Sequence, residues 1–275
     1  MQPKSQIIVR MHLFQNRKIL ILLAFLSVSG CKNTVPEFEL YPIEPTLVLD
    51  FHVLRNGEEV ALDQHFIDQG GFNVNLIALR FFISNIQLTN ADGAETTISD
   101  AEFVDFEPID TNKNNVQWGK APKFYIKAGN YKKLTFGIGL PPNLNAGDPT
   151  LYENADPLST YTFMHWTWAT MYRFIILEAK ADTTGGENLD YNVLFHTGLD
   201  SLYRSDLSFD FNLELQDFER DTLHIDIDWD KLFYTGADSI DLKKESVTHT
   251  TDTPEDFSLA ERFTNNFVAA LSLRK

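Results

Sequence analysis

Three of the seven histidines lie in sequence contexts that could place them at a metal site. His52 follows Phe51 in an apolar segment, His165 opens the sequence His-Trp-Thr-Trp, and His196 follows an apolar pair. Neutral imidazole is the commonest metal ligand in proteins, and two or three converging imidazoles suit copper or zinc. A single histidine is more often a packed or surface residue. These three therefore become a candidate site only if the fold brings them together.

The acidic residues form no recognisable catalytic or calcium motif. Asp226, Asp228 and Asp230 have the spacing that opens an EF-hand loop. That loop also requires glycine at position six and glutamate at position twelve, where this chain has Lys231 and Ala237. The three aspartates instead fit the solvent face of a strand. The sequence also has no G-x-S-x-G elbow and no H-E-x-x-H motif, so we expect a protein that is not an enzyme.

The only cysteine, Cys31, predicts how the chain is exported and anchored. A basic pair at 17–18 precedes an apolar run at 19–26, and small residues at 28–30 stand directly before the cysteine. This order is that of a bacterial signal peptide. Val-Ser-Gly-Cys resembles a lipobox, in which the thiol receives a diacylglyceryl group. We expect residues 1–30 to be a lipoprotein signal peptide and Cys31 to anchor the protein to a membrane on its periplasmic side, as an outer-membrane lipoprotein. The alternative is a plain secretory signal peptide with an unmodified cysteine.

The composition excludes a nucleic-acid-binding protein. The formal net charge is −16, and the first 30 residues contain basic residues but no acidic one, so the mature chain is more acidic still. Nucleic acids are bound by basic surfaces. With Cys31 acylated, no thiol remains for a disulfide or a metal. Imidazole is then the strongest ligand type that the mature chain offers to a soft or borderline metal.

Most of the chain after a tether at 31–45 is predicted to be β-strand. The segment 46–54 is rich in β-forming residues and stops at an Asn-Gly turn signal, while 208–215 alternates apolar and polar residues. The further strands are expected at 74–89, 95–98, 102–106, 123–127, 132–140, 163–180, 191–197, 205–216 and 221–229. Residues 46–275 show no internal repeat and no domain boundary, so we expect them to form one domain.

Only the C-terminus has a helical pattern. Thr253 fits the N-cap and Pro254 the first helical position, and an apolar stripe follows at helical spacing. The stripe consists of Phe257, Ala260, Phe263, Phe267 and Leu271. Many strands with one terminal helix predict an all-β fold, an antiparallel β-sandwich with a C-terminal α-helix.

Three segments form the most specific pattern in the chain. Residues 79–88 read L-R-F-F-I-S-N-I-Q-L before an Asp-Gly turn, residues 164–174 read M-H-W-T-W-A-T-M-Y-R-F, and residues 195–198 read F-H-T-G. Together they resemble the MbnP-like family, the periplasmic copper-binding proteins associated with methanobactin uptake, and their CorA relatives. The family patterns are I-S-N-I-x-L, M-x-W-x-W-x-x-G-Y-x-F and F-H-L-G. His52 falls on an early strand where relatives often carry F-x-H or F-D-H, and the resemblance spans about residues 46–235.

The resemblance implies a β-sandwich that binds copper through histidines, with His52, His165 and His196 as the metal ligands. It also implies that Trp166 and Trp168 lie near the metal. In some members a tryptophan is oxidised to kynurenine by a partner, a di-haem cytochrome c peroxidase. The alternative for the two tryptophans is a place in the core, because residues two apart on a strand share one face.

The chain departs from the family pattern in two places. Met171 stands where a glycine usually precedes the tyrosine, and the cysteines that some relatives carry are missing at 199–206. His65, His224 and His249 lie outside the positions that the resemblance supports, so we expect them to be dispensable for copper.

These observations favour a lipid-anchored periplasmic copper-binding protein for copper acquisition or handling. The alternative is a glycan- or protein-binding lipoprotein of an outer-membrane uptake system. The anchor, the sandwich and the aromatic residues Trp118 and Tyr152, which fall on expected loops, would suit that second function.

Overall fold

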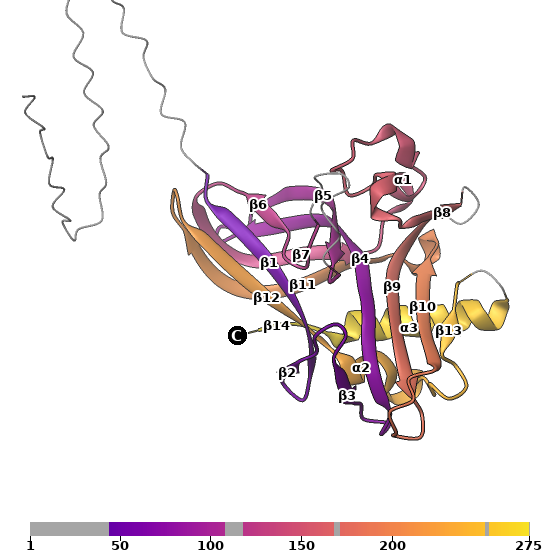
Figure 1. The fold of residues 1–275 in the computed structure, drawn as a ribbon. Helices are drawn as coiled ribbons and strands as arrows, with labels where there is room; N and C mark the ends of the chain where they lie inside the picture. The colour runs from indigo at the N-terminus through magenta and orange to yellow at the C-terminus, as the bar shows by residue number, and fades with distance from the viewer. Residues whose placement is uncertain (1–43, 108–117, 168–170, 251–252, 275) are drawn as a thin grey trace, which may run out of the picture. The chain divides into compact units, whose positions relative to one another are not determined.

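The computed structural model describes residues 44–107, 118–167, 171–250 and 253–274 (Figure 1). The expected signal peptide, Cys31, most of the tether and Trp168 lie outside these ranges. No helix within them is long and apolar enough to cross a membrane.

Two sheets account for most of the domain, as the sequence predicts. The first sheet has the strand order β14-β12-β1-β2, and β6 also pairs with β1. Its strands are β1 Thr46–Arg55, β2 Glu58–Glu59, β6 Lys123–Tyr125, β12 Arg220–Asp228 and β14 Leu271–Leu273. The early strand expected at 46–54 is therefore a central strand of this sheet.

The second sheet has the order β11-β7-β4-β9-β10-β13, with β3 and β5 paired to β4 and β8 paired to β9. Its strands are β3 His65–Ile67, β4 Asn73–Asn90, β5 Glu95–Asp105, β7 Gly129–Ile138, β8 His165–Thr167, β9 Met171–Asp182, β10 Tyr191–Gly198, β11 Arg204–Leu215 and β13 Val247–Thr248. The long strand β4 connects the two halves of this sheet (Figure 1).

Two strand pairs are parallel, so the sheets are mixed and not purely antiparallel. β1 pairs in parallel with β12, and β10 pairs in parallel with β13. A parallel pair needs a long connection, and most of the second sheet is built by the chain between β1 and β12. The predicted sandwich and its C-terminal helix are confirmed, while the strand pairing needs this correction.

A large apolar core fills the space between the sheets. Phe51 of β1, Phe81 of β4 and Phe195 of β10 are fully buried in it, and the rings of Phe51 and Phe81 meet edge-on with centroids 5.2 Å apart. A second, smaller core contains Phe82 and Ile176. Because successive residues of a strand point to opposite faces, this second core covers the other face of the second sheet.

The C-terminal helix α3, Pro254–Ala270, closes the first core. Its N-cap is Thr253, whose hydroxyl accepts the backbone N–H of Asp256 at 3.1 Å, as predicted. Phe263 is fully buried and stacks on Phe195 with ring centroids 4.4 Å apart. The shorter helices are α1 Pro142–Asn145, α2 Trp229–Phe233, η1 Pro149–Leu151, η2 Thr160–Thr162, η3 Asp200–Leu202 and η4 Gly236–Asp238.

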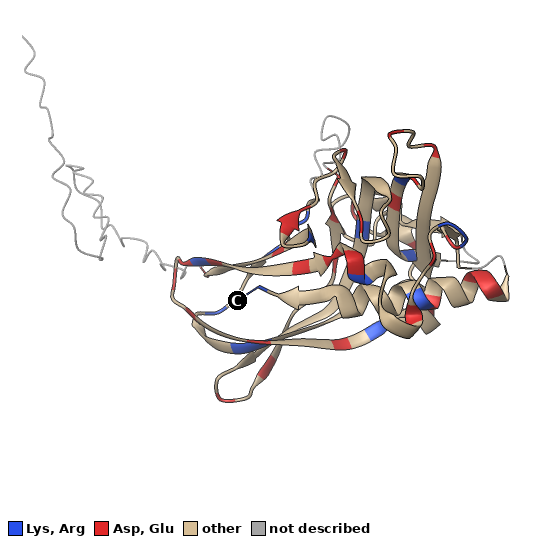
Figure 2. Ribbon diagram, turned by 90° about the horizontal axis from the view of Figure 1, so that it is seen from below, with Lys and Arg blue, Asp and Glu red and all other residues tan. Residues whose placement is uncertain are grey.

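Acidic residues are spread over strands, helices and loops of the domain, with basic residues between them (Figure 2). Most acidic residues of the described chain are exposed or partly exposed, so the negative charge lies mainly on solvated faces.

The strand expected at 163–180 is two strands. β8 and β9 pair antiparallel, and Met171, the first residue of β9, has a φ of 53°. This left-handed conformation suits glycine, because a β-carbon meets the following carbonyl there. The structure therefore gives a physical reason for the glycine that the family pattern has at this position.

Replacing Met171 by glycine should relieve this strain. We expect Met171→Gly to be more stable to urea than Met171→Ala by about 1 kcal/mol, because alanine keeps the β-carbon that left-handed backbone disfavours. The two variants remove nearly the same side chain, so their difference isolates the backbone effect. Equal unfolding midpoints would show that position 171 carries no such strain.

Candidate metal centre

His196 and His249 form a pair of imidazoles held by the backbone around them. Their Nδ1 atoms lie 3.2 Å apart. His196 is on β10, and His249 directly follows β13, which pairs with β10. The Thr250 hydroxyl donates to the His196 carbonyl at 2.8 Å, and the Asp256 carboxylate accepts the His249 backbone N–H at 3.0 Å. The turn after β13 is thus fastened to the strand that carries His196.

The backbone of this turn is strained. Thr250 is buried and has a φ of 76°, in the left-handed region that a β-branched residue rarely adopts. Such outliers persist only where surrounding contacts determine the conformation, and they cluster at functional sites. This outlier stands beside His249.

Glu178 orients the ring of His196. Its Oε1 lies 3.0 Å from Nε2 of His196. An ionised carboxylate can only accept, so Nε2 donates to it and Nδ1 keeps its lone pair on the side of His249. Burial of His196 lowers the pKa of its imidazole, against the opposing effect of Glu178. Burial therefore favours the neutral ring, which is the form that binds a metal.

Trp166 covers the histidine pair. Its ring centroid lies 5.1 Å from that of His196 and 5.7 Å from that of His249. The guanidinium carbon of Arg173 lies 4.1 Å from the centroid of the same indole. Trp166 is 42% exposed, so it is not a core residue. Of the two hypotheses for this tryptophan, a core residue or a neighbour of a metal site, the geometry favours the second.

The two Nδ1 atoms of this pair are separated by a distance that a shared metal ion would require. An ion that lies 2.0–2.1 Å from two imidazole nitrogens at a tetrahedral angle places those nitrogens about 3.3 Å apart, close to the separation of 3.2 Å. Imidazole suits copper and zinc. With two protein nitrogens as ligands, further coordination positions remain for exchangeable ligands.

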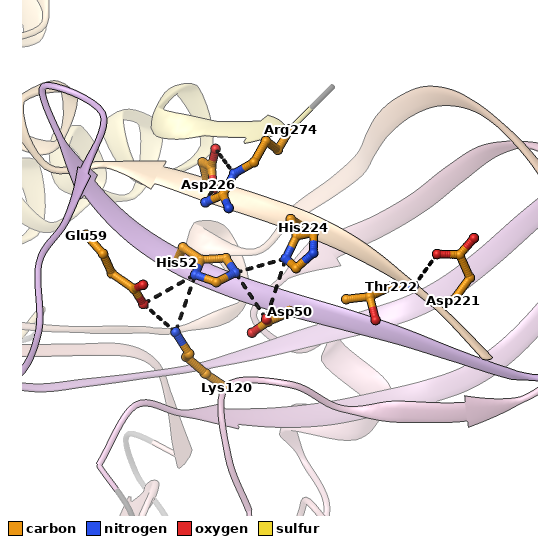
Figure 3. A network of polar contacts seen from close by, with 9 residues as sticks. All are labelled: Asp50, His52, Glu59, Lys120, Asp221, Thr222, His224, Asp226 and Arg274. Atoms are coloured by element: carbon orange, nitrogen blue, oxygen red, sulfur yellow. Dashed lines mark hydrogen bonds and ion pairs between the residues drawn. The ribbon is translucent and has the colours of Figure 1, made fainter.

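His52 lies in a different group. Its Nε2 is 3.1 Å from Nδ1 of His224 and 3.1 Å from Oδ2 of Asp50 (Figure 3). Within the part of the chain that the structure describes, these three residues are the one group of three or more potential ligands whose ligand atoms all lie within 4.8 Å of one another.

The two histidine pairs lie on opposite sides of the first core. Phe51 and Phe195 both point into that core, and the following residues, His52 and His196, must point away from it on their respective sheets. One metal ion therefore cannot bind both His52 and His196, which corrects the expectation of a single shared site. Each histidine separately remains a predicted metal ligand.

His165 belongs to neither pair. Its ring lies edge-on against Tyr172, with centroids 5.0 Å apart, beside the second core. Burial lowers the pKa of His165. His65, on a different strand, is exposed at the start of β3. The predicted role of His165 as a third ligand therefore finds no support in the geometry.

Comparison with known proteins identifies the family. The MbnP family model matches residues 44–252, which is nearly the whole described domain. The chain belongs to the MbnP family. The solved structure of MbnP from Methylosinus trichosporium is similar with a TM-score of 0.51 and 16% sequence identity, covering 78% of this chain and 86% of that chain. At this identity the structural match shows a shared fold. No curated protein matches the chain.

Sequence reasoning misses the second histidine of each pair in this MbnP family member. His224 and His249 lie outside the segments that resemble the family, and were expected to be dispensable. The alternation around His224 does indicate an outward-facing side chain. Parallel strand pairing places His224 beside His52 and His249 beside His196. The sequence does not reveal this pairing, because strand alternation is the same in parallel and antiparallel pairs.

The orienting role of Glu178 gives a direct test. Glu178→Gln should weaken copper binding at the His196–His249 pair roughly tenfold, since changes in the partners of metal-bound histidines typically cost 10–100-fold in affinity. Affinity would be measured by competition with a chelator of known strength. Glu187→Gln, an exposed glutamate in the loop between β9 and β10, is the control. An unchanged affinity in Glu178→Gln would contradict the role.

Proposed function

We propose that this MbnP family member is a lipid-anchored periplasmic protein that binds copper for its acquisition or handling. The observation that carries the proposal is the His196–His249 pair, whose Nδ1 atoms are 3.2 Å apart beneath Trp166. Family membership supports an association with methanobactin and copper. Copper also stands above zinc in affinity for nitrogen sites.

The arrangement suits binding and transfer better than catalysis. Two imidazoles supply the ligands. Glu178 orients one of them, and the Glu178 side chain is 39% exposed. A site with open coordination positions near the surface allows copper to exchange with a partner or a carrier molecule. We propose a non-enzymatic role on this basis.

The glycan-binding alternative has less support. Trp118 and Tyr152, the aromatic residues on which it depends, both pack against the second core. Trp118 meets Phe103 edge-on with ring centroids 5.5 Å apart. Their rings therefore contribute to the stability of the fold, which leaves less aromatic surface for a sugar.

A di-haem peroxidase remains the proposed protein partner. Of the tryptophans proposed to be oxidisable, Trp166 is 42% exposed and lies beside the histidine pair. An indole in this position is accessible to an external oxidising protein. Trp168 lies outside the described residues, so Trp166 is the one whose surroundings support this role.

Copper binding at the pair can be tested by substitution. His196→Ala and His249→Ala should each abolish one equivalent of tightly bound copper, because a single remaining imidazole does not hold the ion. Metal analysis after gel filtration would give the stoichiometry, and quenching of Trp166 fluorescence would report this site, with Trp166→Phe as the reference. His65→Ala is the matched control, since His65 is exposed and outside both pairs. Full copper content in both pair variants would refute the proposal.

The lipid anchor has its own test. Cys31→Ser should move the protein from the membrane fraction to the soluble periplasmic fraction, because the hydroxyl cannot take the diacylglyceryl group through sulfur. Metabolic labelling with a radioactive fatty acid should mark the parent protein and not the variant. A parent protein that takes up no label would show that residues 1–30 act as a plain secretory signal peptide.

A further inference from the structure

We propose that Asp50, His52 and His224 form a second metal site, for a divalent first-row ion bound by two imidazoles and one carboxylate (Figure 3). Among such ions Cu²⁺ has the highest affinity for nitrogen and oxygen ligands, with Zn²⁺ next to it in the same series. This site does not depend on copper at the His196–His249 pair, because the two groups lie on opposite sides of the first core.

Strand register creates the group. Asp50 of β1 is the register partner of His224 of β12, and His52 stands two residues further along β1. All three side chains point away from the first core, because Phe51, which stands between Asp50 and His52, and Ile225, which follows His224, are fully buried. Residues two apart on a strand share a face, so the outer face of the first sheet holds all three ligands together.

The separations match those of a metal centre. His52 Nε2 lies 3.1 Å from His224 Nδ1 and 3.1 Å from Asp50 Oδ2, and the last two atoms are 3.5 Å apart. An ion about 2.0–2.2 Å from nitrogen and carboxylate ligands in tetrahedral geometry requires separations of about 3.3–3.5 Å. The three atoms therefore need to move little to bind an ion.

His52 is oriented for this role from its other side. Its Nδ1 lies 3.3 Å from Oε1 of Glu59, and Lys120 donates to the same carboxylate (Figure 3). Lys120 Nζ also lies 3.4 Å from Nδ1 of His52. Glu59 and Lys120 thus hold the ring on its Nδ1 side, and Nε2 faces Asp50 and His224. A carboxylate behind the imidazole is the usual second partner of a metal-bound histidine.

The site is also accessible to an ion from solvent, and only one of the two nearby carboxylates is free to bind it. The His224 side chain is 42% exposed and that of Asp50 22%, whereas that of His52 is 10% exposed, so an ion can enter from solvent onto a fixed inner ligand. Asp226, the register partner of His52, is held by Arg274 with Nε–Oδ2 at 3.0 Å. Asp226 is therefore already paired, and Asp50 is the carboxylate left for the metal.

A bound ion would join two distant parts of the chain. His52 and His224 are 172 residues apart in sequence and lie on the parallel strands β1 and β12. Binding to the folded state alone stabilises a protein by mass action. Metal at this site should therefore raise the unfolding temperature, an effect that a simple cluster of ion pairs would not show.

The experiment uses the mature protein and its variants Asp50→Asn, His224→Ala and His249→Ala, each loaded with Cu²⁺ and passed over a chelating resin. The parent should keep two equivalents of copper, each single variant one, and the double variant His224→Ala/His249→Ala none. Asp226→Asn, on the same face, is the control and should keep both. Circular dichroism of the metal-free proteins confirms that each variant is folded.

Spectroscopy and stability separate this site from the first one. In the His249→Ala background, Asp50→Asn or His224→Ala should remove the remaining copper-dependent rise in unfolding temperature. In the parent background the same two changes should leave Trp166 quenching intact. The electron paramagnetic resonance signal of Cu²⁺ in His249→Ala should show coupling to two imidazole nitrogens, and no bound-copper signal should remain after the added His224→Ala change. If Asp50→Asn and His224→Ala both keep the parent's copper and its stabilisation, the second site does not exist. If the parent binds one equivalent that His224→Ala alone removes, this site stands and copper at the His196–His249 pair is refuted.

Discussion

The burial of aromatic residues between the two sheets determines where every candidate ligand lies. Phe51 and Phe195 fill the same core, and strand geometry then forces the next residue of each strand to the opposite face. His52 is therefore directed outward from the first sheet and His196 outward from the second. To point either histidine into the core, its strand would have to shift its register by one residue. The same shift would expose a fully buried phenylalanine to solvent. At about 1.5–3 kcal/mol for each buried aromatic side chain, that alternative is strongly disfavoured.

The two faces then differ because only one of them carries a second core. On the second sheet, Phe82, Ile176 and the segment around Tyr172 build an additional apolar layer, and β8 brings Trp166 over His196. On the first sheet the ligands instead meet a charged neighbourhood of Glu59 and Lys120. The same motif, an imidazole with a carboxylate behind it, thus occurs once beside an indole and once among charges. The first environment favours burial of a neutral ring, and the second favours entry of a cation from solvent.

The sequence predicts the elements of this fold better than their pairing. Alternation and turn signals locate β1, β4 and β10, and the Thr253–Pro254 start locates α3, because these signals are local. The division into β8 and β9 is missed, since β9 begins with a left-handed backbone at Met171, where the residue type gives no warning. The family motifs find His52, His196 and Trp166 by position. They cannot find His224 and His249, whose roles depend on parallel pairing between strands far apart in the chain.

Parallel pairing also explains why each candidate site joins early and late segments. β1 pairs with β12, and β10 pairs with the short strand β13, across long stretches of intervening chain. Loop closure over such distances is entropically costly, and contacts across these pairs must offset part of that cost. Hydrogen-bonded imidazoles and carboxylates contribute modestly in the metal-free protein, whereas a bound ion adds its whole binding free energy to the folded state. A bound ion would thus stabilise two strand pairings that each close a long loop, the longer of them between β1 and β12.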